Sequence, residues 1–384
     1  MSPRVLQFVI FLSIVLSILG GLHYYLWARL VRDTAPPGVL ARCGGYALIG
    51  LALSMPLAMV LGRHSLGRPL VWIAFLWMGV MFFLFVALLG TDIVYLGARL
   101  FGGAFDPARR TVLRRLLGGV AGLVAASAGA LALVEALRRV RVVDVTIPLR
   151  RLPRALDGFT IVQLSDIHVG PTIGRGFIEG LVERVNALSA DLVAITGDLV
   201  DGSVARLGDA VAPLAGLRSR HGTYFVTGNH EYYSGAVEWT AELGRLGMRV
   251  LRNERVVIER DGHGFDLAGV DDWHAAGQAP GHGANLRRAL AGYDPTRELV
   301  LLAHQPKQAL EAAELGVGLQ LSGHTHGGQL WPFAYFVRLQ QPFIAGLDRL
   351  KDLVIYTSRG TGYWGPPMRL GAPAEITRIT LRAA

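Results

Sequence analysis

Long apolar stretches, interrupted by polar residues only at intervals, dominate the first third of the chain. Four of them lie at residues 5–27, 44–61, 70–93 and 116–134. Each is close to the roughly 20 residues that a helix needs to cross a bilayer, so the pattern predicts four transmembrane helices. One such stretch alone would equally fit a buried core helix. Four in succession, separated by short arginine-bearing loops, would make an implausibly apolar soluble bundle.

The first apolar stretch has a second interpretation as a cleavable signal sequence, which would leave three spans. No small-residue cleavage signature follows it before Trp27 and Arg29. We therefore expect the stretch to be retained as a membrane helix.

Beyond residue 153 the pattern changes to short apolar runs rich in β-branched residues, which are typical of buried strands. Four of these runs lie at 161–164, 192–195, 224–226 and 299–302. Helical apolar spacing at 176–188 and 204–217 alternates with them, as in an α/β domain. The expected organisation is a transmembrane region at 1–137, a linker at 138–153 with arginines and prolines, and a second domain at 154–384. Within the linker, 140–147 is a candidate edge strand.

Residue types that bind metals follow the predicted strands. In chain order, the clusters are Asp166-Ile167-His168, Gly197-Asp198, Gly228-Asn229-His230-Glu231, His304 and Gly323-His324-Thr325-His326. Together they supply imidazoles, carboxylates and one amide oxygen, a set suited to two divalent ions side by side. Each cluster alone is common in loops, but coincidence explains the ordered series poorly. Because ligands at strand ends converge on one edge of a sheet, we expect them to meet there.

With these motifs, the sequence resembles the calcineurin-like metallophosphoesterase superfamily over roughly residues 159–380. The segments 269–272, 323–329 and 358–376 look like its branch of membrane-associated bacterial phosphodiesterases. The resemblance implies an α/β fold, a four-layer sandwich of two mixed β-sheets flanked by helices. The all-α region of four transmembrane helices would precede it.

The resemblance also implies a role for each matched residue. One divalent metal would be held by Asp166, His168 and His326. Asp198 would bridge to a second metal, completed by Asn229, His304 and His324. The mixed nitrogen and oxygen set leaves manganese, iron, zinc and magnesium open as the metals.

The expected chemistry is hydrolysis of a phosphate ester. Two adjacent dications lower the pKa of a bridging water, so a hydroxide is the expected nucleophile at neutral pH. His230 would stay off the metals and donate a proton to the leaving alkoxide. The family usually has Asp after this histidine, and Glu231 stands there instead. We expect Glu231 to orient the His230 ring through a ring nitrogen.

Arg359 and Arg369, in the glycine-rich tail, are candidates to clamp a substrate phosphate because a guanidinium offers a bidentate fork. The alternative for each is an exposed arginine or a structural ion pair. Asp271 and Asp272 follow an apolar run and fit either the site or a turn.

The basic excess of the chain belongs to its membrane half. Residues 1–143 hold 14 arginines and 4 acidic residues, a net charge of +10, whereas the remainder holds 24 basic and 25 acidic residues, a net charge of −1. This distribution indicates topology and contact with anionic lipid rather than a nucleic-acid groove. We therefore expect the bilayer as a partner, no nucleic acid as a stable partner and no obligate protein partner.

Arginine asymmetry gives an orientation for the four helices. The loops between spans one and two and between spans three and four carry eight arginines, against three on the other side at Arg4, Arg63 and Arg68. The positive-inside rule then places the second domain outside the cytoplasm of a bacterial inner membrane. The arginines just after span four would restore parity if counted, but long domains translocate largely regardless of flanking charge.

The sequence therefore predicts a membrane-anchored phosphodiesterase with a dinuclear metal centre. Its anchor favours a substrate at the bilayer surface, such as a phospholipid or a lipid-linked nucleotide sugar. Two alternatives stay open: a phosphomonoesterase or protein phosphatase, and a non-catalytic, membrane-tethered metal-binding sensor.

Overall fold

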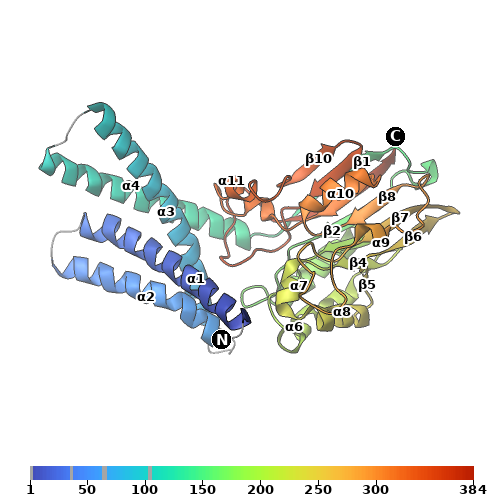
Figure 1. The fold of residues 1–384 in the computed structure, drawn as a ribbon, viewed down its shortest axis with the longest axis horizontal. Helices are drawn as coiled ribbons and strands as arrows, with labels where there is room; N and C mark the ends of the chain where they lie inside the picture. Colours follow the sequence, from blue (N-terminus) through green and yellow to red (C-terminus); the bar gives the residue numbers. More distant parts are fainter. Residues whose placement is uncertain (1–2, 35–37, 63–66, 103–105) are drawn as a thin grey trace. The chain divides into compact units, whose positions relative to one another are not determined.

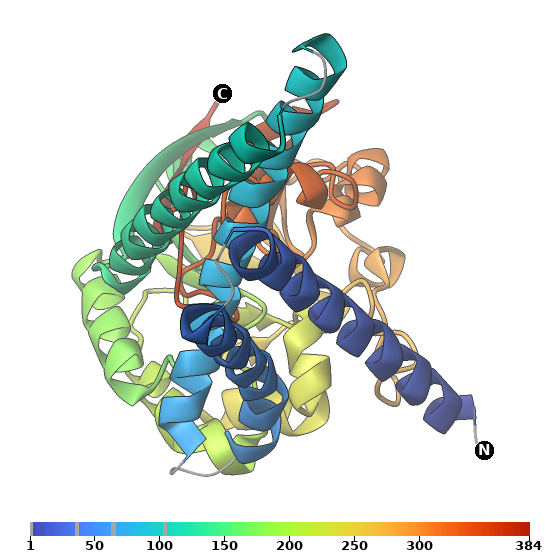
Figure 2. The same cartoon turned by 90° about the vertical axis from the view of Figure 1, so that its left-hand side faces the viewer.

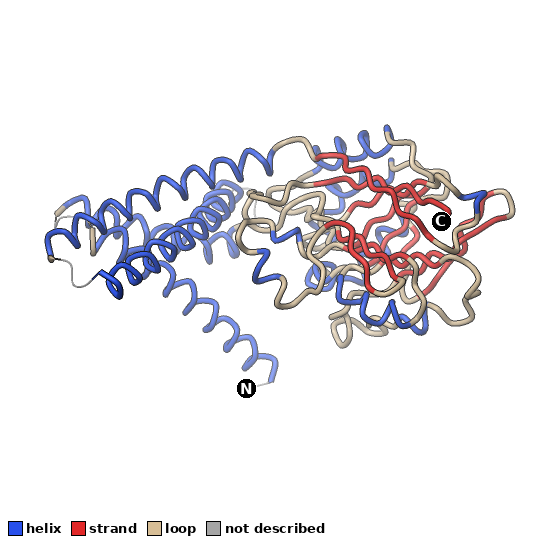
Figure 3. Tube along the Cα trace, turned by 90° about the horizontal axis from the view of Figure 1, so that it is seen from above, coloured by secondary structure: helices blue, strands red, loops and turns tan. Residues whose placement is uncertain are grey.

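The computed structural model describes residues 1–384 except 1–2, 35–37, 63–66 and 103–105, so Arg63 lies outside the described residues. The chain forms two compact units (Figure 1). The first comprises Met1–Val134 with Gly365–Met368, and the second comprises Glu135–Trp364 with Arg369–Ala384. Helices make up the first unit, whereas the strands belong to the second (Figure 3).

The described part of the first unit contains four long helices (Figure 2). They are α1 (Pro3–Trp27), continued by a π-helical turn (Ala28–Arg32), α2 (Val39–Leu61), α3 (Arg68–Gly102) and α4 (Pro107–Leu137). All four are long and apolar enough to cross a membrane, which confirms the predicted transmembrane helices. The helices α3 and α4 extend well beyond the apolar stretches that predicted them, because flanking residues such as Arg99 and Arg109 are good helix formers.

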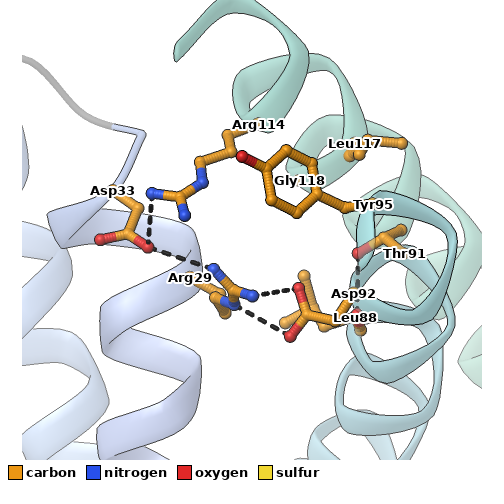
Figure 4. Close-up of a pocket in the computed structure, with 9 residues that line it drawn as sticks. All are labelled: Arg29, Asp33, Leu88, Thr91, Asp92, Tyr95, Arg114, Leu117 and Gly118. Carbon is orange, nitrogen blue, oxygen red and sulfur yellow. Dashed lines mark hydrogen bonds and ion pairs between the residues drawn. The ribbon is translucent and has the colours of Figure 1, made fainter. Parts of the chain in front are cut away.

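Several charged side chains of the first unit are paired with one another (Figure 4). Arg29 donates to Asp92 on α3, with Nε 3.0 Å from Oδ2, and its Nη1 lies 3.2 Å from Asp33. Tyr25 donates to the same Asp92 oxygen at 2.8 Å, and Arg114 pairs with Asp33 at 3.3 Å. These pairs compensate charges that would otherwise be costly among apolar helices.

Two mixed six-stranded sheets form the second unit. The first has the order β1-β12-β2-β3-β4-β5, with β1 (Arg141–Leu149), β12 (Glu375–Ala383), β2 (Thr160–Leu164), β3 (Leu192–Thr196), β4 (Thr223–Val226) and β5 (Arg249–Val250). The second has the order β10-β11-β9-β8-β7-β6, with β10 (Gly346–Leu350), β11 (Leu353–Thr357), β9 (Leu319–Ser322), β8 (Leu299–Leu302), β7 (His263–Gly269) and β6 (Glu254–Arg260). The strands β2 to β5 run parallel, as do β7, β8, β9 and β11.

Seven helices accompany the sheets: α5 (Arg175–Ala187), α6 (Val204–Val211), α7 (Asn229–Ser234), α8 (Ala236–Arg245), α9 (Leu286–Ala289), α10 (Ala309–Glu314) and α11 (Ala334–Val337). Alternate strand residues face opposite sides. Thus Ile161 packs in the core between the sheets, whereas Val162 packs against a second core shared with α5, α6 and α8. A third core joins the other sheet to α9 and α10 (Figure 1). These four layers confirm the predicted sandwich.

The segment expected to be a linker is largely occupied by the edge strand that the sequence suggested at 140–147. Within 138–153, Arg141–Leu149 forms β1 and pairs in parallel with β12 at the edge of the first sheet. Its inward residues Ile147 and Leu149 are buried in the core between the sheets, which explains why the segment joins the domain. Only residues 138–140 separate α4 from β1.

We predict that Phe265→Ala weakens the second unit by about 3–5 kcal/mol, because a large side chain leaves a cavity between the sheets. Phe265 on β7 is fully buried, and its ring lies 5.2 Å from that of Phe159. The measurement is denaturant unfolding of the full chain in detergent. Val257→Ala, at an exposed position of β6, is the control and should change stability by less than about 0.5 kcal/mol. Equal losses in both variants would contradict the packing described.

Candidate metal centre

The candidate ligands stand at the ends of central strands in both sheets. Asp166, Asp198 and Asn229 follow β2, β3 and β4, while His304 and His324 follow β8 and β9. These strands are parallel neighbours within their sheets. Their carboxyl ends meet at one edge of each sheet, so the side chains converge there.

One group of possible metal ligands consists of Asp166, His168 and His326, all buried. His168 Nε2 lies 3.0 Å from His326 Nε2, and His326 Nε2 lies 3.4 Å from Asp166 Oδ1. Two imidazole nitrogens facing each other beside a carboxylate are suited to share a cation.

The second group consists of Asp198, His304 and His324. His304 Nε2 lies 3.1 Å from Asp198 Oδ2 and 3.2 Å from His324 Nδ1. The same Asp198 oxygen is 3.9 Å from His168 Nε2, so this carboxylate faces the first group as well.

Asn229 supports the fit to a metal. Its side chain is largely buried, and its Oδ1 has no hydrogen-bond partner among the residues that the structure describes. Burying an amide oxygen without a partner is costly. A divalent cation bound at this edge would satisfy that oxygen, because amide oxygens are suitable metal ligands.

The backbone is left-handed at most of the candidate ligands. Positive φ angles between 51° and 71° occur at Asp166, His168, Asp198, His324 and His326. Residues with a Cβ rarely adopt this region, and each such residue costs of order 1–3 kcal/mol unless its surroundings impose it. Sharp turns at the strand ends thus direct these side chains toward the site.

Hydrogen bonds to the second ring nitrogen orient two of the imidazoles. His304 Nδ1 is 2.7 Å from the carbonyl oxygen of Thr196, and His168 Nδ1 is 3.0 Å from Asp201 Oδ1. Each contact leaves Nε2 turned toward the ligand groups. Such outer contacts fix both tautomer and ring orientation.

His230 belongs to a third group of possible metal ligands, with His168 and Asp201. Its Nε2 lies 4.0 Å from Asp198 Oδ2, and its Nδ1 lies 2.6 Å from Asp201 Oδ1. Burial alone would lower the pKa of His230. The charge of Asp198 and the hydrogen bond with Asp201 outweigh burial and raise the pKa to about 9.

Asp201, and not Glu231 as expected, contacts the ring nitrogen of His230 and orients the ring. The Glu231 carboxylate accepts hydrogen bonds from the backbone N–H groups of Asp198 (3.0 Å), Leu199 (2.8 Å) and Gly228 (2.6 Å). It is fully buried and ties the turn after β3 to the start of α7. Sequence reasoning missed Asp201, although its place three residues after Asp198 was an available signal.

Arg369 is a structural brace, contrary to the expected phosphate clamp. It is fully buried and donates to the carbonyl oxygens of Gly362 (2.8 Å) and Ala372 (2.7 Å). Its Nη2 lies 3.2 Å from Nδ1 of His326. The guanidinium therefore holds the tail against the first ligand group, where no face is left for a substrate.

Arg359 forms a structural ion pair, which is the alternative that the sequence left open for it. Its Nη1 donates to Glu375 at 3.0 Å, and Glu375 is buried.

Asp271 and Asp272 are buried beside the site in hydrogen bonds with Arg252 and Gln305. Neither aspartate belongs to a group of possible ligands within the described part of the chain.

Comparison with known proteins agrees with this geometry. The sequence model of the calcineurin-like phosphoesterase family matches residues 159–328. A zebrafish protein, "Transmembrane protein with metallophosphoesterase domain" (Danio rerio), is 38% identical over 98% of this chain and 90% of its own length. Its namesake from Bos taurus is 45% identical over 73% of this chain and 65% of its own length. An uncharacterized metallophosphoesterase of Campylobacter jejuni is 32% identical over 98% of this chain and 99% of its own length.

A two-sheet sandwich with histidines and aspartates gathered at its strand ends defines the class of metal-dependent phosphoester hydrolases. The chain belongs to the calcineurin-like metallophosphoesterase family. Its four apolar helices and the names of its vertebrate relatives support association with a membrane.

We predict that Gly197→Ala lowers metal affinity about 10–100-fold, because it disturbs groups that support the ligands. Gly197 has a φ of 84°, and a Cβ there would lie 2.6 Å from the Gly228 nitrogen and 2.8 Å from His304 Nδ1. Metal content after dialysis against a graded chelator is the measurement. Gly208→Ala is the matched control, since a Cβ there meets only Val204 at 3.7 Å. Unchanged metal retention by Gly197→Ala would refute the close approach.

Proposed function

We propose that this protein is a membrane-anchored phosphodiesterase whose site holds two divalent metal ions. The observation that carries the proposal is the position of Asp198, whose Oδ2 faces imidazoles of both ligand groups. A carboxylate between two groups of ligands is suited to bridge two cations. We assign one metal to Asp166, His168 and His326, and the other to Asn229, His304 and His324.

When bound, the metals would supply positive charge that neutralises phosphoryl oxygens and activates water as a nucleophile. The residues of the chain complete the reaction. His230, whose pKa is raised by the charge of Asp198 and the hydrogen bond with Asp201, would donate a proton to the leaving alkoxide. Asp201 would act as a positioning residue that holds His230 Nδ1, so that Nε2 faces the site.

The location of the chain favours a substrate at the bilayer surface, a phospholipid or a lipid-linked pyrophosphate. We propose a multi-pass protein of the bacterial inner membrane, with the catalytic domain outside the cytoplasm. A boundary near residue 137 between the membrane region and the catalytic domain is part of this proposal. A phosphomonoesterase or protein phosphatase would use the same ligands, and a non-catalytic sensor would bind metal without turnover.

We predict that Asp198→Asn lowers diester turnover by about 10²-fold or more and weakens metal binding, because it removes the charge that both ligand groups face. Hydrolysis of chromogenic diesters and monoesters, with metals added back singly, is the measurement. Asp209→Asn, an exposed position on α6, is the control and should behave as the wild type. Faster monoester than diester turnover in the wild type would favour the phosphatase alternative, and metal binding without turnover would favour the sensor.

We predict that Asp201→Asn moves the alkaline limb of the pH profile of kcat/KM to lower pH. The charge of Asp201 raises the pKa of His230, and the general acid must be protonated, so activity falls as pH rises through that pKa. Removing the charge lowers the pKa, and activity should fall about 10–100-fold at alkaline pH. Metal content measured in parallel separates this effect from weaker binding by His168, which also contacts Asp201. An unshifted profile with full metal content would exclude His230 as the acid.

A further inference from the structure

Large apolar side chains are exposed on the segment that follows the His326 turn. We call residues 331–339 the aromatic segment; its exposed members are Trp331, Phe333, Tyr335, Phe336 and Leu339, each at least 47% exposed. The short helix α11 within it buries none of its residues. Contiguous apolar patches on a protein surface mark contact with another protein or with a membrane.

The aromatic segment is fixed at both ends. At its start, Trp331 donates to the carbonyl oxygen of Leu370 at 2.9 Å, and Leu370 donates to that of Gln329 at 2.8 Å. At its end, buried Gln341 donates to Gln305 at 3.2 Å and accepts from the backbone of Lys307 at 3.2 Å. The exposed side chains therefore project from a defined frame.

The aromatic segment also adjoins the metal centre. Four residues separate His326 from Trp331, and a Cβ at Gly328 would lie 2.6 Å from Ala334, so α11 packs directly on the ligand turn. The Gln329 side chain pairs with the backbone of Trp364 in both directions, at 2.9 and 3.0 Å. The Trp364 ring, 53% exposed, lies 5.6 Å from the ring of His230. Exposed aromatic surface thus continues from the aromatic segment to the edge of the site.

The amino-acid composition around the aromatic segment favours contact with a bilayer interface. Residues 323–347 contain no aspartate or glutamate, and Arg338 lies among the aromatic residues. Tryptophan and tyrosine are enriched at the level of lipid headgroups, where an adjacent cation meets the phosphates. The chain itself supplies the membrane, since only three residues connect α4 to β1. A tether this short spans at most about 11 Å and keeps the second unit at a high effective concentration near lipid.

We propose that the aromatic segment is an interfacial membrane-binding element, which inserts Trp331, Tyr335 and Phe336 among lipid headgroups beside the metal centre. A lipid phosphate at the headgroup level would then reach the site without leaving the bilayer. The membrane contact does not depend on the proposed function, whereas its effect on turnover rests on the proposed phosphodiesterase activity.

Nitroxide quenching in the full-length protein tests the contact. In a Cys43→Ser background, Phe336→Cys is labelled with an environment-sensitive fluorophore and placed in nanodiscs with headgroup-region nitroxide lipids. We expect at least about twofold more quenching than for a label at Leu310→Cys, an equally exposed position on α10. Equal quenching at the two positions overturns the proposal. This is also the result expected if a protein, and not lipid, covers the aromatic segment. This result needs no enzymatic activity, so it is independent of the proposed function.

A second measurement connects the contact to turnover. Phe336→Asp should lower hydrolysis of a phospholipid diester in liposomes about tenfold, because a charge replaces the exposed aromatic ring that would insert among the lipids. Hydrolysis of a water-soluble diester by the same preparation should stay unchanged. Val237→Asp, at an exposed apolar position of α8, is the matched control and should affect neither substrate. Equal losses on both substrates would show a purely structural role and overturn the proposal.

Discussion

Two buried carboxylates at the strand ends impose the constraint on which the site depends. Burial raises the pKa of Asp166, whereas His304 and His230 outweigh burial and hold the pKa of Asp198 well below its usual range. Asp198 in turn raises the pKa of His304 despite burial, while burial and the nearby His304 lower the pKa of His324 to about 3. Buried groups whose pKa values are raised and groups whose pKa values are lowered thus lie next to one another, away from water. Divalent cations would satisfy the carboxylates and the neutral imidazoles together, which is why burial of this set is compatible with a stable fold.

The backbone meets this constraint with sharp turns and with glycines. Left-handed residues direct side chains toward the site directly after buried strands, and the three backbone bonds to Glu231 stabilise the turn that carries Asp198. Glycines permit the close approach of neighbouring turns, since a Cβ at Gly228 would collide with Asp198 and one at Gly323 with Asp166. The hydrophobic cores on both faces of each sheet support the strained turns, so stability from packing offsets the strain at the site.

Charge compensation also governs the helical unit, where Arg29 pairs with Asp33 and Asp92 among long apolar helices. The two units solve the same problem with different partners. In the helical unit, Asp33 and Asp92 meet arginines from the chain itself, and these pairs need no further ion. At the strand ends the carboxylates meet imidazoles, and burial lowers the pKa of two of these, His324 and His326, so that they become neutral. Carboxylates beside neutral imidazoles are metal ligands, and this makes the edge, rather than the polar cluster of the helices, suited to metal.

The sequence predicted those features that follow from residue type and periodicity. Apolar length identified the helices, β-branched runs identified the central strands, and their ends located Asp166, Asp198 and His304 at one edge. It did not predict roles that depend on the reach of a side chain across the fold. Arg369 and Arg359 have the right chemistry for phosphate, yet the Arg369 guanidinium donates to backbone carbonyls and Arg359 Nη1 donates to Glu375. Asp201 takes the role that was expected of Glu231, because the Glu231 carboxylate accepts hydrogen bonds from the backbone of the turn after β3, while Asp201 reaches two imidazoles. Local sequence patterns therefore determine where the polar side chains come together. Which of them form hydrogen bonds or ion pairs with one another depends on the packed structure.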